Sequence, residues 1–328
     1  MTPREVGLGL QGDKPLEAYP HLGTIAEEGG FDVISVFNDL LFRPAIVPLL
    51  LLAQATERVR LGPAALNPFT LHPVEIAGQI AALDSLSRGR AYLGLVRGAW
   101  LESVGVGGAR SVTALAEAVE VVRRLLAGDR SGYPGEHFRL APGQALAYEV
   151  LRPRVPLLIG AWGERAAAFA GAAADELKLG GSANPAMIPV MRGRLGSDRV
   201  RIVVGAVTVV DEDGAAARRL ARTEAALYFP VVAGLDPTLE LPPDVVEEVR
   251  TLVNAGDRRA AGELIPDDVL DRLAFSGTPE QVARQAEALY EAGADRVEFG
   301  TPQGLTTERG IRLISERVLP RLRQKRGS

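Results

Sequence analysis

Short apolar runs alternate along the chain with longer stretches whose apolar residues recur at helical spacing. Strands that alternate with helices in this way are typical of βα units, which assemble a parallel sheet. The runs predict eight strands, each followed by a helix or a helix-bearing segment. The predicted strands cover residues 5–12, 31–37, 58–66, 90–96, 155–161, 175–181, 200–210 and 295–300.

Eight βα units in one chain most simply close into a (β/α)8 TIM barrel, and an open doubly wound sheet is the alternative. The 328 residues exceed a usual single domain but suit a barrel. Residues 129–154 are rich in glycine and proline, which indicates a hairpin or a long loop, and residues 211–273 form a long polar helical section. We therefore expect one α/β domain over residues 1–328 with these two insertions.

The composition excludes several classes of protein. Hydrophobic residues make up 47% of the chain and charged residues 24%, which is enough for a large core. The net charge is −4, and no block of like charges precedes a short basic tail, so nucleic-acid binding is not expected. Cysteine is absent and the three histidines are far apart in sequence, so no metal site is expected either.

Neither a membrane span nor an export signal is expected. The apolar run at 45–55 is too short to cross a bilayer, and it contains Pro48. The first ten residues lack the long apolar core of a signal peptide. These observations predict a soluble cytoplasmic protein.

Two strand ends attract interest, because TIM barrels carry their chemistry at the carboxyl ends of the strands. The turn at 157–168 passes from strand to helix through Gly160 and Gly163, and a glycine-rich turn before a helix start can hold a phosphate group. A tight βα turn without a ligand is the alternative. Ala64 and Ala65 leave room for a flat ring against the backbone, although ordinary small-residue packing explains them equally well.

Other chemistry is poorly represented in the sequence. There is no Walker, G-x-S-x-G or Ser-x-x-Lys pattern, and the first strand lacks the G-x-G-x-x-G spacing. An aldolase-type barrel would need a basic lysine, and Lys178 is the one interior candidate, although its run also suits the sheet exterior. Hydride transfer needs few catalytic side chains, because the cofactor carries the chemistry. A redox role is therefore compatible with this site. Arg97, in a long loop, is a candidate for binding an anionic group, and the alternative is that it is simply solvated.

The chain resembles the bacterial luciferase-like superfamily and, within it, the coenzyme F420-dependent methylenetetrahydromethanopterin reductases. The matching stretches are residues 25–32, 57–95, 156–175 and 275–304, with the runs LGPxxxNPxTxHP and LDxLSxGR. The resemblance implies a dimeric barrel with insertions that binds a deazaflavin or a flavin at its carboxyl-end face. It also implies a cis peptide at Ala64–Ala65 behind the ring and the cofactor phosphate at Gly160–Gly163.

On this resemblance, the chain is expected to be an oxidoreductase that transfers a hydride between coenzyme F420 and a small organic substrate. The alternatives are an FMN-dependent luciferase-like monooxygenase and a non-catalytic relative that has lost its cofactor. Related reductases often have Asp-His where this chain has Asn38-Asp39, and methanogen-type reductases carry a glutamate at the position of Gly9. No catalytic side chain is assigned. The residues expected to bind the cofactor are Asn38, Asp39, Ala64, Ala65, Asn67, Arg97, Gly98, Gly160, Ala161, Trp162, Gly163 and Glu164.

Overall fold

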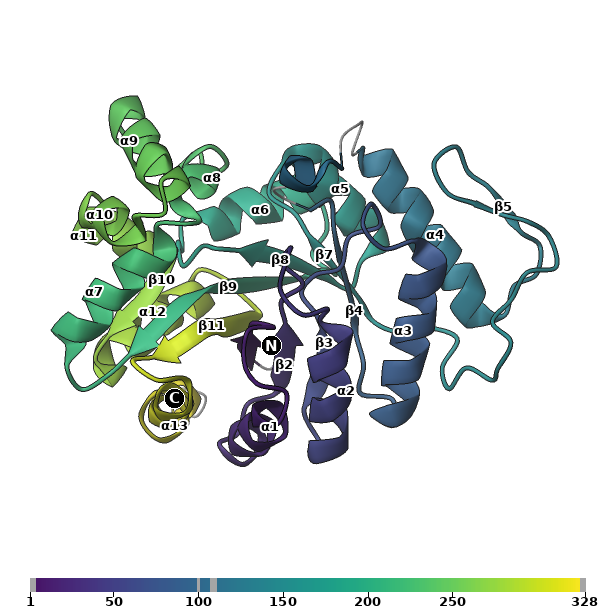
Figure 1. The fold of residues 1–328 in the computed structure, drawn as a ribbon, viewed down its shortest axis with the longest axis horizontal. Helices are drawn as coiled ribbons and strands as arrows, with labels where there is room; N and C mark the ends of the chain where they lie inside the picture. Colours follow the sequence, from purple (N-terminus) through teal and green to yellow (C-terminus); the bar gives the residue numbers. More distant parts are fainter. Residues whose placement is uncertain (1–3, 99–100, 107–110, 325–328) are drawn as a thin grey trace. The chain divides into compact units, whose positions relative to one another are not determined.

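The computed structural model describes residues 4–98, 101–106 and 111–324 (Figure 1). The chain forms two compact units. Unit 1 comprises Met1–Leu10, Ile25–Asp32 and Lys178–Ser328, and unit 2 comprises Gln11–Thr24 and Val33–Leu177. Every residue expected to bind the cofactor belongs to unit 2, so the candidate site is described within that unit.

The strands confirm the predicted alternation, because each of the eight predicted runs contains one. Two further strands form a hairpin inside the insertion at 129–154, and the short strand β10 was not predicted. The strands are β1 (Glu5–Leu10), β2 (Val33–Val36), β3 (Arg60–Pro63), β4 (Leu93–Val96), β5 (Tyr133–Pro134), β6 (Arg139–Leu140), β7 (Leu157–Gly160), β8 (Glu176–Gly180), β9 (Arg201–Val210), β10 (Ala274–Gly277) and β11 (Arg296–Gly304).

Helices follow most of the strands, as the periodicity predicts. A short 3-10 helix, η1 (Leu101–Val104), lies in the loop after β4, and a π-helical stretch, η2 (Ile314–Val318), separates the last two α-helices. The α-helices are α1 (Ala18–Glu28), α2 (Ile46–Ala55), α3 (Pro73–Leu86), α4 (Val112–Ala127), α5 (Glu164–Ala173), α6 (Met187–Leu195), α7 (Gly214–Ala225), α8 (Phe229–Ala233), α9 (Pro243–Asn254), α10 (Arg258–Glu263), α11 (Asp267–Leu273), α12 (Pro279–Glu291), α13 (Thr307–Leu313) and α14 (Leu319–Gln324).

The sheet of unit 1 has the strand order β1–β11–β9–β8, and β10 pairs with the C-terminal residues of β9. The β1–β11 and β11–β9 pairs are parallel, with Leu8 opposite Phe299 and Phe299 opposite Ala206. In β1, Val6, Leu8 and Leu10 alternate with glycines and are all buried. This alternation places the apolar side chains on one face of the sheet and the glycines on the other.

The opposite face of this sheet carries a buried ion pair. The Lys178 ammonium on β8 bonds the Glu298 carboxylate on β11, and Arg296 Nε lies 3.0 Å from the other Glu298 oxygen. A Cβ at Gly7 would come within 2.5 Å of Glu298 Cγ, and one at Gly205 within 3.3 Å of Lys178 Cε. The two glycines therefore provide the space that the pair fills.

The sheet of unit 2 places four strand ends along one edge. Strand β2 pairs with β3 in parallel, and β4 pairs with β7 in parallel. Parallel bridges from Leu61 to Ala91 and from Leu66 to Leu95 join β3 to β4. The order β2–β3–β4–β7 follows, with all four carboxyl ends at the same edge.

The LDxLSxGR run stabilises the amino ends of β3 and β4. Asp84 is fully buried and accepts hydrogen bonds from Ala91 N at 3.3 Å and from Arg152 Nε at 2.9 Å. The Arg90 guanidinium donates to the carbonyl groups of Ala53, Thr56, Val59 and Ser87. These contacts lie away from the carboxyl ends of the strands, so this part of the motif supports the fold and not the chemistry.

A carboxylate clamp holds the hairpin β5–β6 against α4. Glu117 is buried, and its oxygens accept hydrogen bonds from the backbone N–H groups of Glu136, His137 and Phe138 at 3.0, 2.7 and 2.9 Å. Burial raises the pKa of Glu117, but the three N–H donors outweigh it, and the pKa is lowered overall. The insertion at 129–154 is thus a hairpin with one firm anchor.

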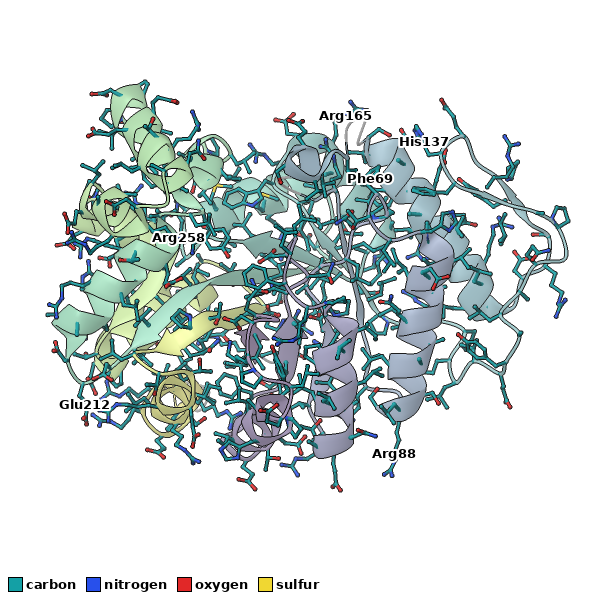
Figure 2. All side chains as sticks on the ribbon, viewed as in Figure 1. Phe69, Arg88, His137, Arg165, Glu212 and Arg258 are labelled. Atoms are coloured by element: carbon teal, nitrogen blue, oxygen red, sulfur yellow. The ribbon has the colours of Figure 1, made fainter. Side chains whose placement is uncertain are left out.

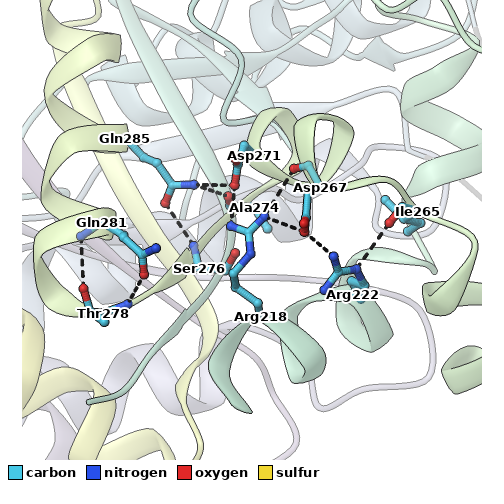
Figure 3. Close-up of polar contacts among 10 residues, drawn as sticks. All are labelled: Arg218, Arg222, Ile265, Asp267, Asp271, Ala274, Ser276, Thr278, Gln281 and Gln285. Carbon is cyan, nitrogen blue, oxygen red and sulfur yellow. Dashed lines mark hydrogen bonds and ion pairs between the residues drawn. The ribbon is translucent and has the colours of Figure 1, made fainter. Parts of the chain in front are cut away.

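The second insertion folds into α7–α11, and Figure 1 shows α9, α10 and α11 grouped with α7. Figure 3 shows the polar contacts at its base. Arg218 donates to Asp267 at 2.8 Å and to Asp271 at 2.6 Å, and Arg222 also bonds Asp267. Beside this cluster, Thr278 and Gln281 form a capping box that starts α12.

Candidate functional site

The two strand ends that the sequence singles out are separated by one strand. Leu66 N donates to Gly94 O at 3.0 Å, and Val96 N donates back to Leu66 O at 2.9 Å. Val96 is in turn the register partner of Gly160. The segment after β3 and the segment after β7 therefore flank β4 at one edge of unit 2.

The peptide between Ala64 and Ala65 is cis, as the resemblance implies. Ala64 N donates to Val36 O at 2.8 Å, which ties this peptide to the end of β2. A Cβ at Gly94 would lie 2.1 Å from the Pro63 carbonyl oxygen and 3.4 Å from Ala65 Cβ. The backbone behind the two alanines is thus closely supported by β4.

The turn from β7 into α5 presents an open helix start. Gly163 is the N-cap of the ten-residue helix α5 and makes no side-chain capping bond. A Cβ at this glycine would meet no atom within 4 Å among the described residues. Backbone N–H groups and the positive end of the helix dipole favour an anion at such a position. Ala161 is buried, Trp162 is half-buried and Glu164 is exposed.

Asn67 builds the turn after β3. Its Oδ1 accepts hydrogen bonds from Phe69 N, Thr70 N and Thr70 Oγ1 at 3.2, 3.0 and 3.1 Å. The carbonyl oxygen of this buried side chain is therefore committed to the turn, and any contact with a ligand falls to its Nδ2 group. Phe69 in this turn and Arg165 at the start of α5 are labelled in Figure 2.

Arg97 and Gly98 begin the loop after β4. Arg97 is exposed at this edge of unit 2. Gly98 has a φ of +82°, which favours glycine, and a Cβ there would approach Leu101 Cδ1 to 3.0 Å and Asn67 Cγ to 3.4 Å. The start of this loop therefore packs on the Asn67 turn, and it brings a cation to the same edge as the α5 start.

Asn38 and Asp39 follow β2 and have different partners. Asn38 Oδ1 accepts a hydrogen bond from Ala45 N at 3.0 Å, which closes the loop that leads into α2. Asp39 Oδ2 accepts a hydrogen bond of 2.7 Å from Gln11 Nε2. Gln11 lies at the end of the first predicted strand, directly after Leu10, the last residue of β1, and only the structure shows that it contacts Asp39.

Alternative chemistry finds little support. Lys178 is buried and paired with Glu298, so it is not the exterior residue that its run allowed, and its ammonium is engaged in the ion pair. Among the described residues, no three His, Cys, Asp or Glu side chains form a group that could hold a metal ion. No helix in the described part of the chain is long and apolar enough to cross a membrane.

Comparison with known proteins places this geometry in context. Residues 1–296 match the family model described as luciferase-like monooxygenase. The chain is 29% identical over 318 residues to the 5,10-methylenetetrahydromethanopterin reductase of Archaeoglobus fulgidus, a match that covers 91% of this chain and 94% of that protein. It is 28% identical over 328 residues to the F420-dependent glucose-6-phosphate dehydrogenase of Nakamurella multipartita, covering 92% of this chain and 91% of that protein.

A solved structure supports the fold. The coenzyme F420 dependent tetrahydromethanopterin reductase of Methanopyrus kandleri superposes with a TM-score of 0.84 at 23% identity, covering 97% of this chain and 99% of that one. The fold class is therefore the predicted (β/α)8 barrel with insertions, and not the open doubly wound sheet.

Proposed function

Because the chain belongs to the luciferase-like monooxygenase family, we propose that it is a coenzyme F420-dependent oxidoreductase that transfers a hydride between the deazaflavin and a small organic substrate. The two relatives named above support this choice, because one is a reductase of a pterin substrate and the other is an F420-dependent dehydrogenase of a sugar phosphate. Their substrates differ, so they favour the reaction type over any one substrate.

The observation that carries the proposal is the shared edge of β3, β4 and β7. It holds the supported backbone of Ala64–Ala65 and, one strand away, the uncapped start of α5 at Gly163. These features fit a flat ring with a phosphate-bearing side chain, since one backs a plane and the other attracts an anion. When bound, the deazaflavin supplies the hydride chemistry. Ala64 and Ala65 would back the ring, and Gly160–Gly163 would hold the phosphate.

The remaining residues would serve the cofactor from the same edge. Asp39, which follows β2, and the Nδ2 group of Asn67, which follows β3, would hydrogen-bond a ring edge, and Asn38 would support the loop that carries Asp39. Exposed Arg97 would meet an anionic part of the cofactor. Few acids or bases are needed, because these residues bind and orient and do not carry the electrons.

Cofactor titration tests the proposal. The purified protein is titrated separately with oxidised coenzyme F420 and with FMN, and binding is followed by the fluorescence of each cofactor. We expect saturable binding of the deazaflavin and much weaker binding of FMN. Tight binding of FMN without binding of the deazaflavin would favour the monooxygenase, and binding of neither would favour a relative without a cofactor.

We also propose that the protein is a homodimer that acts in the cytoplasm. Exposed apolar side chains on unit 2, with relative exposures of 93% at Leu41, 45% at Phe42 and 37% at Val47, support association through this region. Light scattering coupled to gel filtration tests the assembly, and Val47→Glu should yield monomers. We further propose that the two units form one barrel domain, which a single cooperative unfolding transition would support.

A further inference from the structure

A buried glutamine next to the candidate cofactor site is locked in one orientation. Gln11 is only 4% exposed, and its Oε1 accepts a hydrogen bond from Gly12 N at 3.1 Å. Because one end of the side-chain amide accepts this bond, the other end must donate. That donor, Nε2, lies 2.7 Å from Asp39 Oδ2. The contact is thus a directed bond from a neutral amide to a carboxylate oxygen.

The backbone that carries Gln11 is fixed as well. The buried Tyr19 hydroxyl donates to Gln11 O at 2.7 Å, and burial raises the pKa of Tyr19, so the phenol keeps its proton. Arg43 holds the next residue, because Arg43 N donates to Gly12 O at 3.2 Å. A Cβ at Gly12 would lie 2.6 Å from Arg43 O, so the two loops are in close contact.

We propose that Gln11 is a positioning residue: its side-chain amide holds the half-buried Asp39 carboxylate in place after β2, ready to accept a hydrogen bond from a donor on the cofactor. The inference rests on the proposed function. While it is ionised, the Asp39 carboxylate accepts hydrogen bonds and donates none. The neutral amide of Gln11 therefore orients the Asp39 carboxylate without placing a second charge beside it.

Other charged groups in these loops have partners of their own. Lys14 Nζ pairs with Asp13 Oδ1 at 2.7 Å, and Arg43 donates to the carbonyl oxygens of Gly12 and Lys14 at 3.3 and 2.8 Å. Tyr19 is protonated and hydrogen-bonded. The contact that carries the inference is the 2.7 Å hydrogen bond from Gln11 Nε2 to Asp39 Oδ2.

The test is a set of titrations with oxidised coenzyme F420, each compared with the wild type at the same pH. Gln11→Met removes the donor, and affinity should fall about ten- to a hundredfold at every pH, as expected for a hydrogen bond to a charged group. Gln11→Glu places a second carboxyl beside Asp39, and the pair will share one proton at low pH. Its affinity should fall at pH 8 and return to within about threefold of the wild type near pH 5.

The matched control is Gln303→Met. Gln303 is also fully buried, and its Nε2 donates to a backbone carbonyl, Gly9 O, at 2.6 Å. Gln303→Met should therefore show how much deazaflavin affinity is lost when any buried glutamine amide is removed, and this affinity should not recover at low pH. Thermal unfolding of each variant at both pH values separates loss of folding from loss of affinity.

The outcomes separate the two claims. If the wild type does not bind the deazaflavin, the proposed function fails and this inference falls with it. If the wild type binds and Gln11→Glu stays equally weak at both pH values, or Gln11→Met binds like the wild type, only the inference is overturned. In a double-mutant cycle, Gln11→Met should add nothing to Asp39→Asn, and additive losses would also overturn it. Should Gln11→Met not fold, the pH response of Gln11→Glu decides.

Discussion

Gly94 lies so close to Pro63 that a Cβ at position 94 would stand 2.1 Å from the Pro63 carbonyl oxygen. The obstructing atom belongs to the backbone, so it cannot move aside as a flexible side chain would. We expect Gly94→Ala to push β3 away from β4 and to lower the free energy of unfolding by ~3 kcal/mol or more. Urea denaturation measures the loss, and deazaflavin affinity should fall as well, because Ala65 lies beside this contact.

Gly193→Ala is the control for this prediction. Gly193 is in α6, and a Cβ there would meet no described atom within 4 Å. Alanine favours a helix over glycine, so this variant should be as stable as the wild type or more stable by up to ~1 kcal/mol. Equal losses in both variants would contradict the close contact at Gly94.

The Glu117 clamp predicts a pH-dependent anchor for the hairpin β5–β6. The pKa of Glu117 is lowered in the folded protein, so its carboxylate stabilises the fold above the unfolded pKa, about 4.3, and this contribution is lost as pH falls through the folded pKa. Glu117→Gln should cost ~1–2 kcal/mol at pH 7. The difference from the wild type should shrink at acid pH, as measured by urea denaturation at pH 7 and at pH 3.5.

The exposed Glu136→Gln serves as the reference for Glu117→Gln, since Glu136 contributes a backbone N–H to the clamp and its side chain faces solvent. This variant should leave stability unchanged at both pH values. A deficit in Glu117→Gln that is the same at both pH values would indicate a packing defect and not the loss of an ionised acceptor.

Two aspartates that pair with arginine should differ in how much stability is lost when each is replaced by asparagine. Asp84 is fully buried against Arg152, so Asp84→Asn leaves a cation without its carboxylate and should cost ~3–5 kcal/mol. Asp267 binds both Arg218 and Arg222, but its side chain is 70% exposed, so Asp267→Asn should cost less than ~1 kcal/mol. The small effect should also diminish in high salt. Equal losses in denaturation experiments would contradict burial as the deciding factor.

At the start of α5, we expect Gly163→Asp to raise stability and to lower deazaflavin affinity. Gly163 has the extended backbone of an N-cap, with φ −76° and ψ 156°, so Gly163→Asp should stabilise the helix by a few tenths of a kcal/mol. The added carboxylate should repel a phosphate and weaken deazaflavin binding about tenfold or more. Gly163→Asn has nearly the same shape without the charge and should bind better than Gly163→Asp. Equal deazaflavin affinities of the two variants would contradict a phosphate position at this turn.

Much of the fold could be predicted because it depends on local patterns. The alternation of apolar runs with helical stretches located all eight barrel strands, and proline and glycine marked the hairpin around Tyr133. Strand β10 escaped prediction, since four residues between two helices give too short a pattern to identify. The strand forms because Ala274–Gly277 pairs in parallel with Val207–Val210 at the end of β9.

The sequence predicts where the candidate site lies, but it does not predict the contacts within that site. Glycines and alanines at strand ends indicated where a backbone can approach a ligand, and the parallel sheet brought Ala64 and Gly160 to one edge. The sequence could not show that Asn67 Oδ1 accepts hydrogen bonds from its own turn. Nor could it show that Gln11 and Asp39, which are 28 residues apart in sequence, form a hydrogen bond. Such contacts depend on how distant loops fold against each other, which a periodic pattern does not encode.

The buried pair of Lys178 and Glu298 has a consequence for how this chain can evolve. Substitution of Glu298 by a neutral residue would remove the buried carboxylate that both Lys178 and Arg296 contact. A Cβ at Gly7 would collide with Glu298, and one at Gly205 would crowd Lys178. Homologues that lack the pair should therefore have exchanged these positions together, through neutral residues of matching volume, so that covariation in an alignment would trace the interior of this sheet.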